Sequence, residues 1–101
     1  MNDYMFLMHA HGPETGDFGS RYDWQPYLAK LRNSGRLSGG SAIGPGICVS
    51  KSGAAADITA HLSGFLRVQA DSIEDARKLL EDNPVYEAGG TVEIRELPRT
   101  G

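Results

Sequence analysis

The fold is decided by residues 64–97, which read GFLRVQADSIEDARKLLEDNPVYEAGGTVEIREL. Residues 64–70 alternate in polarity and predict a strand, with Leu66, Val68 and Ala70 on one face. Residues 91–97 alternate in the same way and predict an edge strand, on which Val92 and Ile94 face inward and Glu93 and Arg95 face outward. The intervening residues have the composition of an amphipathic helix.

This helix is expected to begin at Asp71 or Ser72, because either side chain can cap it and Glu74 or Asp75 completes a capping box. Asn83-Pro84 is expected to end it. Its buried stripe is predicted to comprise Ile73, Ala76, Leu79 and Leu80.

The N-terminal half predicts a similar succession. Residues 4–9, YMFLMH, are apolar at both odd and even positions, as in a strand that is covered on both faces. After a polar loop at 14–20, Asp23 can cap a helix that Asn33-Ser34-Gly35 stops, with a stripe of Trp24, Tyr27, Leu28 and Leu31. Residues 37–49 predict two short strands broken at 44–46, and residues 51–53 predict a hairpin tip.

The order of elements therefore predicts one α+β domain over residues 1–101, a ferredoxin-like split β-α-β sandwich. Two helices cover one face of such a sheet. The first strand and Phe65 leave apolar side chains on the other face, which predicts a homodimer whose open sheet faces stack on each other.

Composition narrows the possible partners of this 101-residue chain. Its net charge is −3, with a pI near 5.5 and dispersed basic residues, so nucleic acid is not an expected partner. The longest strongly apolar stretch, Met5–Met8, is too short for a signal peptide or a membrane span. The single cysteine, Cys48, leaves no disulfide framework and favours a cytoplasmic location. Its place between Ile47 and Val49 predicts a buried thiol.

Three histidines are the candidates for chemistry. His9 and His11 point to the same side of an extended strand, and His61 is a possible third. The three could bind zinc, but the chain has no cysteine pair to help close such a site, so neither a metal nor another cofactor is expected. The other hypothesis is metal-free acid–base catalysis with a carboxylate such as Asp23 or Asp57.

Three further residues are candidates for substrate binding. Arg67 could hold a substrate carboxylate, or it could be a residue of the dimer interface or of the solvated surface. Trp24 and Tyr27 could form the core or the wall of a pocket.

The sequence closely resembles the YCII-related (DGPF-domain) family over nearly its whole length. The resemblance is carried by residues 4–8, 35–37, 39–40, 64–65, 70–76, 83–85 and 89–95. It implies a ferredoxin-like fold and a dimeric α+β barrel. The Asp-Gly-Pro-Phe motif of many members is absent, since residues 55–61 read AADITAH and only Asp57 corresponds. The positions of the His-Asp dyad proposed for one branch hold Trp24 and Asn33.

We therefore expect a homodimer with a small-molecule cleft between the sheet, the first helix and the loop after the first strand. Its predicted lining is His9, His11, Trp24, His61 and Arg67. The expected activity is a simple proton transfer, isomerase-like or hydrolase-like, with the histidines in the catalytic role. The alternative is a non-catalytic ligand-binding or regulatory module. The two differ in whether a histidine is hydrogen-bonded to an orienting carboxylate.

Overall fold

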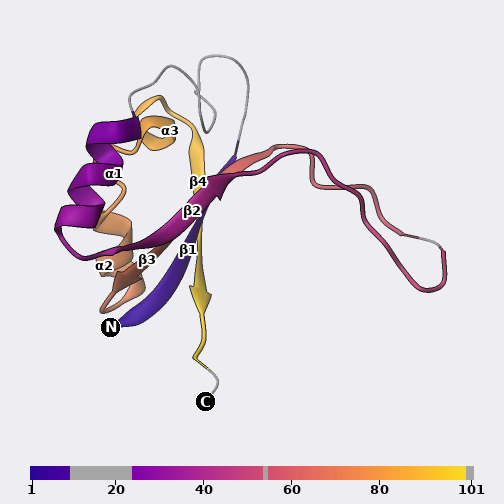
Figure 1. Cartoon of the computed structure of the whole chain (residues 1–101), viewed down its shortest axis with the longest axis horizontal. Helices are drawn as coiled ribbons and strands as arrows, with labels where there is room; N and C mark the ends of the chain where they lie inside the picture. The colour runs from indigo at the N-terminus through magenta and orange to yellow at the C-terminus, as the bar shows by residue number, and fades with distance from the viewer. Residues whose placement is uncertain (10–23, 54, 100–101) are drawn as a thin grey trace.

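The computed structural model describes residues 1–9, 24–53 and 55–99. A four-stranded antiparallel sheet in the order β2-β3-β1-β4 forms one layer, and the helices form the other (Figure 1). The elements in chain order are β1 (Asn2–His9), α1 (Trp24–Asn33), β2 (Leu37–Ala42), β3 (Leu62–Ala70), α2 (Ile73–Lys78), α3 (Pro84–Glu87) and β4 (Thr91–Leu97). The predicted α+β class is confirmed. None of the described helices is long and apolar enough to cross a membrane.

The first strand lies at the centre of the sheet, between β3 and β4. Its side chains alternate, so Tyr4, Phe6 and Met8 are buried against the helices. Met5 and Leu7 point to the opposite side, which we call the open face, and are half-buried. In register with Leu7 lie Phe65 of β3 and Glu93 of β4. Within the described residues no helix covers the open face (Figure 1).

Helix α1 ends as its sequence predicts. Gly35 adopts a left-handed φ of 75°, a conformation that costs glycine little. The amides of Gly35 and Arg36 donate to the carbonyl oxygens of Arg32 and Leu31, which satisfies two carbonyls of the last turn. Together with β1 and β3, α1 and the C-terminal helices bury one core, which contains Trp24, Tyr27, Leu31, Leu66, Val68, Ala70, Ala76, Leu80 and Val85.

The second helical region differs from the prediction. Ser72 caps α2 as expected and accepts a hydrogen bond from the Asp75 amide at 3.1 Å. The helix ends at Lys78, however, and the expectation that Asn83-Pro84 ends it was wrong. Asn83 instead caps a further helix, α3, and Pro84 stands at its start, where a missing amide costs nothing. Ile73, at the first position of this short α2, is 48 % exposed and not buried as predicted.

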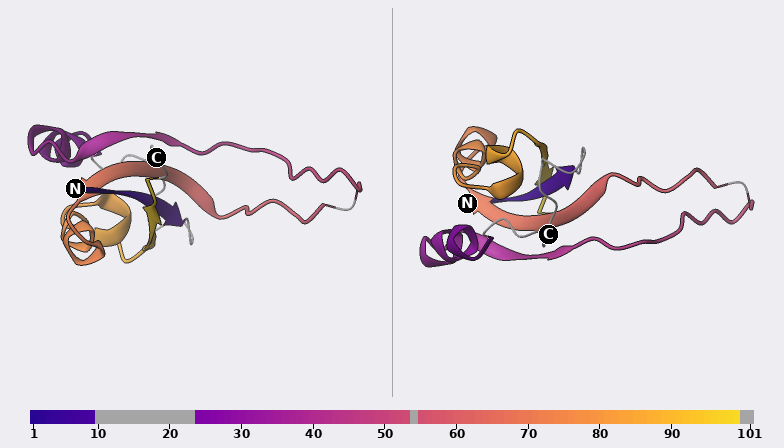
Figure 2. Two further views of the ribbon diagram at one scale, coloured as in Figure 1. Left: turned by 90° about the horizontal axis from the view of Figure 1, so that it is seen from below. Right: turned by 90° about the horizontal axis from the view of Figure 1, so that it is seen from above.

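Between β2 and β3 the chain forms a long projection, the hairpin arm (residues 43–53 and 55–61), shown in Figures 1 and 2. A turn closed by the Gly53 amide and the Ser50 carbonyl lies at its tip, as predicted. The strand predicted around Ile47–Val49 does not form. Pro45 has no amide to donate and lies between two glycines, so it interrupts strand pairing. Cys48 is exposed, which corrects the expectation of a buried thiol.

Candidate active site on the open sheet face

The candidate site lies at the end of the sheet where β1 finishes. His9 is the last residue of β1, opposite Thr91 of β4. The pairing with β3 shifts by one residue between Met8 and His9, so that His9 faces Leu62. Such a shift increases the local twist and changes the direction of side chains at the end of a strand.

His9 forms a close pair with a carboxylate. Its Nε2 lies 3.0 Å from Oε1 of Glu93, and the two side chains are 15 % and 39 % exposed. An ionised carboxylate can only accept hydrogen bonds, so Nε2 of His9 carries a hydrogen and donates a hydrogen bond to Oε1 of Glu93. In the neutral ring, the basic lone pair is then on Nδ1. A carboxylate in this position fixes the tautomer and stabilises the imidazolium that forms when Nδ1 takes a proton.

The Glu93 carboxylate is itself held on its other side. Nη1 of Arg95 donates to Oε2 of Glu93 at 3.4 Å, while Oε1 accepts from His9. Glu93 and Arg95 are two residues apart on β4, so they project from the same face of the sheet. Arg95 and His9 thus contact the two oxygens of one carboxylate, which holds the Glu93 side chain in place.

A second imidazole lies beside the first. The ring centroids of His9 and His61 are 4.7 Å apart, with an angle of 45° between the ring planes. His61 is exposed and stands at the base of the hairpin arm, immediately before β3. Strands β1 and β4 and the residue before β3 thus bring two imidazoles and one carboxylate together. Such a group can accept a proton at one position and donate one at another.

None of the other predicted site residues that the structure describes is part of this cluster. His11 and Asp23 lie outside the described residues, and Asp57 is exposed on the hairpin arm. Arg67 is exposed on the open face, but it is in register with Met5, four residues before His9 and about 13 Å along the strand.

Trp24 and Tyr27 lie on the opposite side of the sheet from His9. They are 6 % and 1 % exposed within the core, and their rings meet edge to face. The Tyr27 hydroxyl donates to the carbonyl oxygen of Leu79 at 2.7 Å. Burial raises the pKa of Tyr27 to about 12. Among the described residues, His9 and Trp24 therefore do not line one cleft, and His11 and the loop after β1, which were predicted to complete the lining, lie outside those residues.

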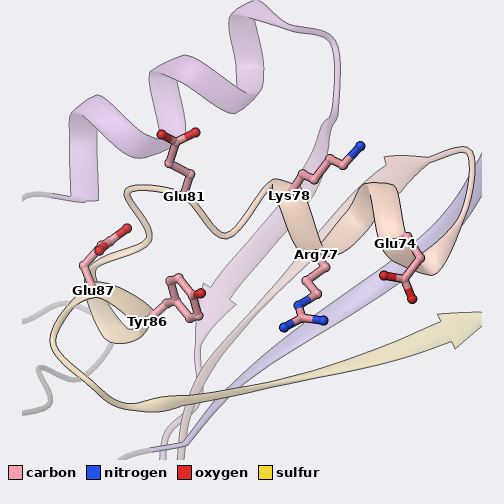
Figure 3. A pocket seen from close by; sticks show the side chains of 6 residues that line it. All are labelled: Glu74, Arg77, Lys78, Glu81, Tyr86 and Glu87. Carbon is pink, nitrogen blue, oxygen red and sulfur yellow. The ribbon is translucent and has the colours of Figure 1, made fainter.

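An open groove of about 410 Å³ lies elsewhere, between α2 and α3. In Figure 3 the Arg77 guanidinium and the Tyr86 ring lie in the space between the two helices. The groove contains charges of both signs, and its lining comprises Glu74, Arg77, Lys78, Glu81, Tyr86 and Glu87. The residues that line the groove include no histidine, so it holds no counterpart of the His9–Glu93 pair.

Metal binding receives no geometric support in the part of the chain that is described. Over residues 1–9, 24–53 and 55–99, no three histidine, cysteine, aspartate or glutamate side chains are grouped so that they could hold a metal ion.

Sequence reasoning missed Glu93 and Arg95 as functional residues. It placed both on the outward side of the last strand, which is where they lie, but it assigned them no role. The signal that could have found them is strand pairing. Once β1 and β4 are neighbours and antiparallel, the odd positions of β1 and the outward positions of β4 share one face, and His9 meets an acidic residue there.

Comparison with known proteins supports the fold. No family model matches the chain, and no curated protein matches it. Among solved structures, the chain is similar to 5-chloro-2-hydroxyhydroquinone dehydrochlorinase (TftG) from Burkholderia phenoliruptrix AC1100, in complex with 2,5-dihydroxybenzoquinone. The TM-score is 0.60 at 16 % sequence identity, over 97 % of this chain and 95 % of that one. The likeness shows a shared α+β fold.

Proposed function

We propose that this chain is a YCII-related protein that transfers a proton on a small organic molecule at the His9–Glu93 pair. The observation that carries the proposal is the 3.0 Å contact between Nε2 of His9 and Oε1 of Glu93. A histidine held by an orienting carboxylate is the feature that distinguishes an acid–base catalyst from a simple binding module. The orienting residue is Glu93, in place of the Asp23 or Asp57 considered from the sequence.

The proposed reaction is an isomerisation that needs no other reactant. Nδ1 of His9 removes a proton from a carbon or an oxygen of the substrate, and Glu93 stabilises the imidazolium formed. A proton is returned at a second atom of the substrate, from His9 itself or from His61, whose ring is 4.7 Å away. The substrate changes from one tautomer to another, so atoms and charge balance.

The assembly belongs to the same proposal. The strand order β2-β3-β1-β4, with helices on one face, supports a ferredoxin-like protomer. The half-buried Met5, Leu7 and Phe65 on the open face support a homodimer through that face, which would form a dimeric α+β barrel. A cytoplasmic location is proposed because a single cysteine offers no disulfide framework. The substrate-binding roles of Trp24, Tyr27 and Arg67 stay predictions.

The test uses 2,5-dihydroxybenzoquinone, the ligand of the dehydrochlorinase with the same fold. The ring hydrogens of this quinone exchange with solvent only by proton transfer to and from carbon. The rate at which their proton NMR signals disappear in heavy water therefore measures acid–base catalysis directly. We expect the protein to accelerate this exchange, as followed by proton NMR. His9→Gln and Glu93→Gln should each reduce the acceleration by about a hundredfold or more. Glu96→Gln, at an exposed glutamate of the same strand, should leave it unchanged.

Two outcomes would contradict the catalytic proposal. If calorimetry shows that the probe binds but its exchange is not accelerated, the chain is a ligand-binding module, the alternative that the sequence left open. If the exchange is accelerated equally by wild-type protein and His9→Gln, the His9–Glu93 pair does not carry the reaction.

A further inference from the structure

We propose that the hairpin arm is an intersubunit arm, which docks on a second copy of this chain and covers the His9–Glu93 site of that copy. The inference rests on the proposed homodimer and goes further, because it makes each site incomplete without the other subunit. It follows from the shape of the arm, its side chains, the face available to receive it and the place where it leaves the sheet.

The arm projects far from the rest of the chain. Figure 1 shows it on the side away from the helices, and both views of Figure 2 show it extending well past the ends of the strands. The radius of gyration is 14.7 Å, compared with about 13 Å for a compact domain of this length. The principal extents are 45 × 40 × 19 Å. The described residues from Gly44 to His61 are all exposed.

The exposed side chains of the arm are apolar to an unusual degree. Ile47 is 84 % exposed, Val49 is 81 % exposed and Ile58 is 43 % exposed. Only Lys51 and Asp57 carry a full charge in the arm. A two-stranded hairpin is at best marginally stable on its own in water. An apolar arm of this kind therefore needs an apolar surface of another molecule, and its lack of charge does not fit nucleic acid.

The open face of a second copy offers such a surface. Leu7 and Phe65 are direct cross-strand neighbours at its centre, and Met5 lies two residues away on the same face. No described helix covers these side chains, and they are half-buried in the single chain. A monomeric protein seldom leaves a contiguous apolar patch of this kind uncovered.

The area of the arm is sufficient for a stable complex. An extended chain exposes about 1.45 Å² per dalton, which gives about 2,500 Å² for a segment of this length. If a third to a half of that area is buried on the second copy, each arm contributes about 800 to 1,300 Å². A standard stable interface buries about 800 Å² per partner.

The arm leaves the sheet at the end that carries the candidate site. It begins after β2 at Ile43 and returns at His61, beside the His9 ring. When two open faces pack with their strands aligned and running the same way, both arms and both sites come to one end of the dimer. Each arm then lies across the site of the other copy. Its Ile47 and Val49 would exclude water from the His9–Glu93 pair, which strengthens electrostatic interactions there.

The test exploits Cys48, which is exposed on the arm and is the single cysteine of the chain. A nitroxide spin label is attached to Cys48 of protein at natural isotope abundance. This protein is then mixed with isotope-labelled Cys48→Ser protein, which carries no spin label. Any broadening of the isotope-labelled signals arises from the other copy. We expect broadening of the His9 ring and Leu7 methyl signals, and recovery when the nitroxide is reduced. The Val85 methyl signals, in the core under the helices, should be affected least.

A second measurement tests the energetics. Ile47→Asp with Val49→Asp should raise the dimer dissociation constant about tenfold or more in sedimentation experiments, because each side chain loses apolar burial. Ile73→Asp, at an exposed isoleucine of α2, is the matched control and should leave it unchanged.

Two results would overturn the inference. One is a dimer in which the His9 signals are not broadened by the nitroxide of the other copy. The other is a monomer at NMR concentrations. Either result can occur while the wild-type protein still accelerates exchange of the quinone probe. The failure of the arm proposal is thus distinguishable from the failure of the proposed function.

Discussion

Tyr27 offers the most quantitative test of the packing described above. Its hydroxyl donates to the Leu79 carbonyl at 2.7 Å and so joins α1 to the residue that ends α2. The side chain is 1 % exposed. Tyr27→Phe keeps the ring but leaves the carbonyl without this donor. The free energy of unfolding at pH 7 should fall by about 1 to 2 kcal/mol, the usual cost of one lost buried hydrogen bond.

The same residue predicts a dependence on pH. Burial raises the pKa of Tyr27 to about 12, from an ordinary value of 10. The folded state therefore favours the neutral phenol. The stability that this pKa difference gives to the folded state is fully present below pH 10, and it is lost as the pH rises toward 12. At about 1.36 kcal/mol per pKa unit, the loss totals about 2.7 kcal/mol, and about half is gone at pH 11. Phenylalanine cannot ionise and suffers no such loss.

Urea unfolding at pH 7, 9 and 11 would measure both effects. We expect Tyr27→Phe to be less stable than wild type at pH 7 and 9, and nearly equal to it at pH 11. Tyr86→Phe, at a tyrosine that is 48 % exposed, is the matched control and should differ little from wild type at pH 7. A stability difference that stays constant from pH 7 to pH 11 would refute the argument from burial, and no difference at pH 7 would refute the argument from the hydrogen bond.

Gly40→Ala should destabilise the fold by about 1 to 3 kcal/mol, because the added methyl would lie 2.5 Å from the Phe65 carbonyl oxygen and the strands must shift. Gly44→Ala, where nothing lies within 4 Å, is the control, and equal thermal stability of the two variants would contradict this prediction. Asp3 accepts a hydrogen bond from Arg99, which lowers the pKa of the Asp3 carboxyl below its ordinary value of 3.8. The pair therefore stabilises the fold above about pH 4, and this stabilisation is lost as the pH falls through the lowered pKa. Arg99→Gln should raise the Asp3 pKa in an NMR titration of its carboxyl carbon, and an unchanged pKa would rule out this cause.

Local patterns predicted most of the elements. The alternation in 64–70 and 91–97, the cap at Ser72 and the stop at Gly35 each depend on residues close together in sequence, and each is present in the structure. The end of α2 was missed because its apolar spacing continues through Leu80 although the helix does not. Asn83-Pro84 gives the same signal whether it follows one helix or begins another.

The candidate site depends on contacts that no local pattern contains. His9 and Glu93 are 84 positions apart, and they meet only because β4 pairs with β1 in one particular register. The hairpin arm was misread for a related reason. The apolar run at Ile47–Val49 indicates that these side chains need cover, but it does not say whether the same chain provides that cover.

The central position of β1 has a consequence for synthesis of the protein. β1 is synthesised before β3 and β4 and pairs with both of them, so Asp3 lies opposite Gln69 and Leu97. Both edges of β1 are therefore paired only when β4 is available. The sheet is completed only after residues 91–97 have left the ribosome, and until then β1 is a target for chaperones and for aggregation.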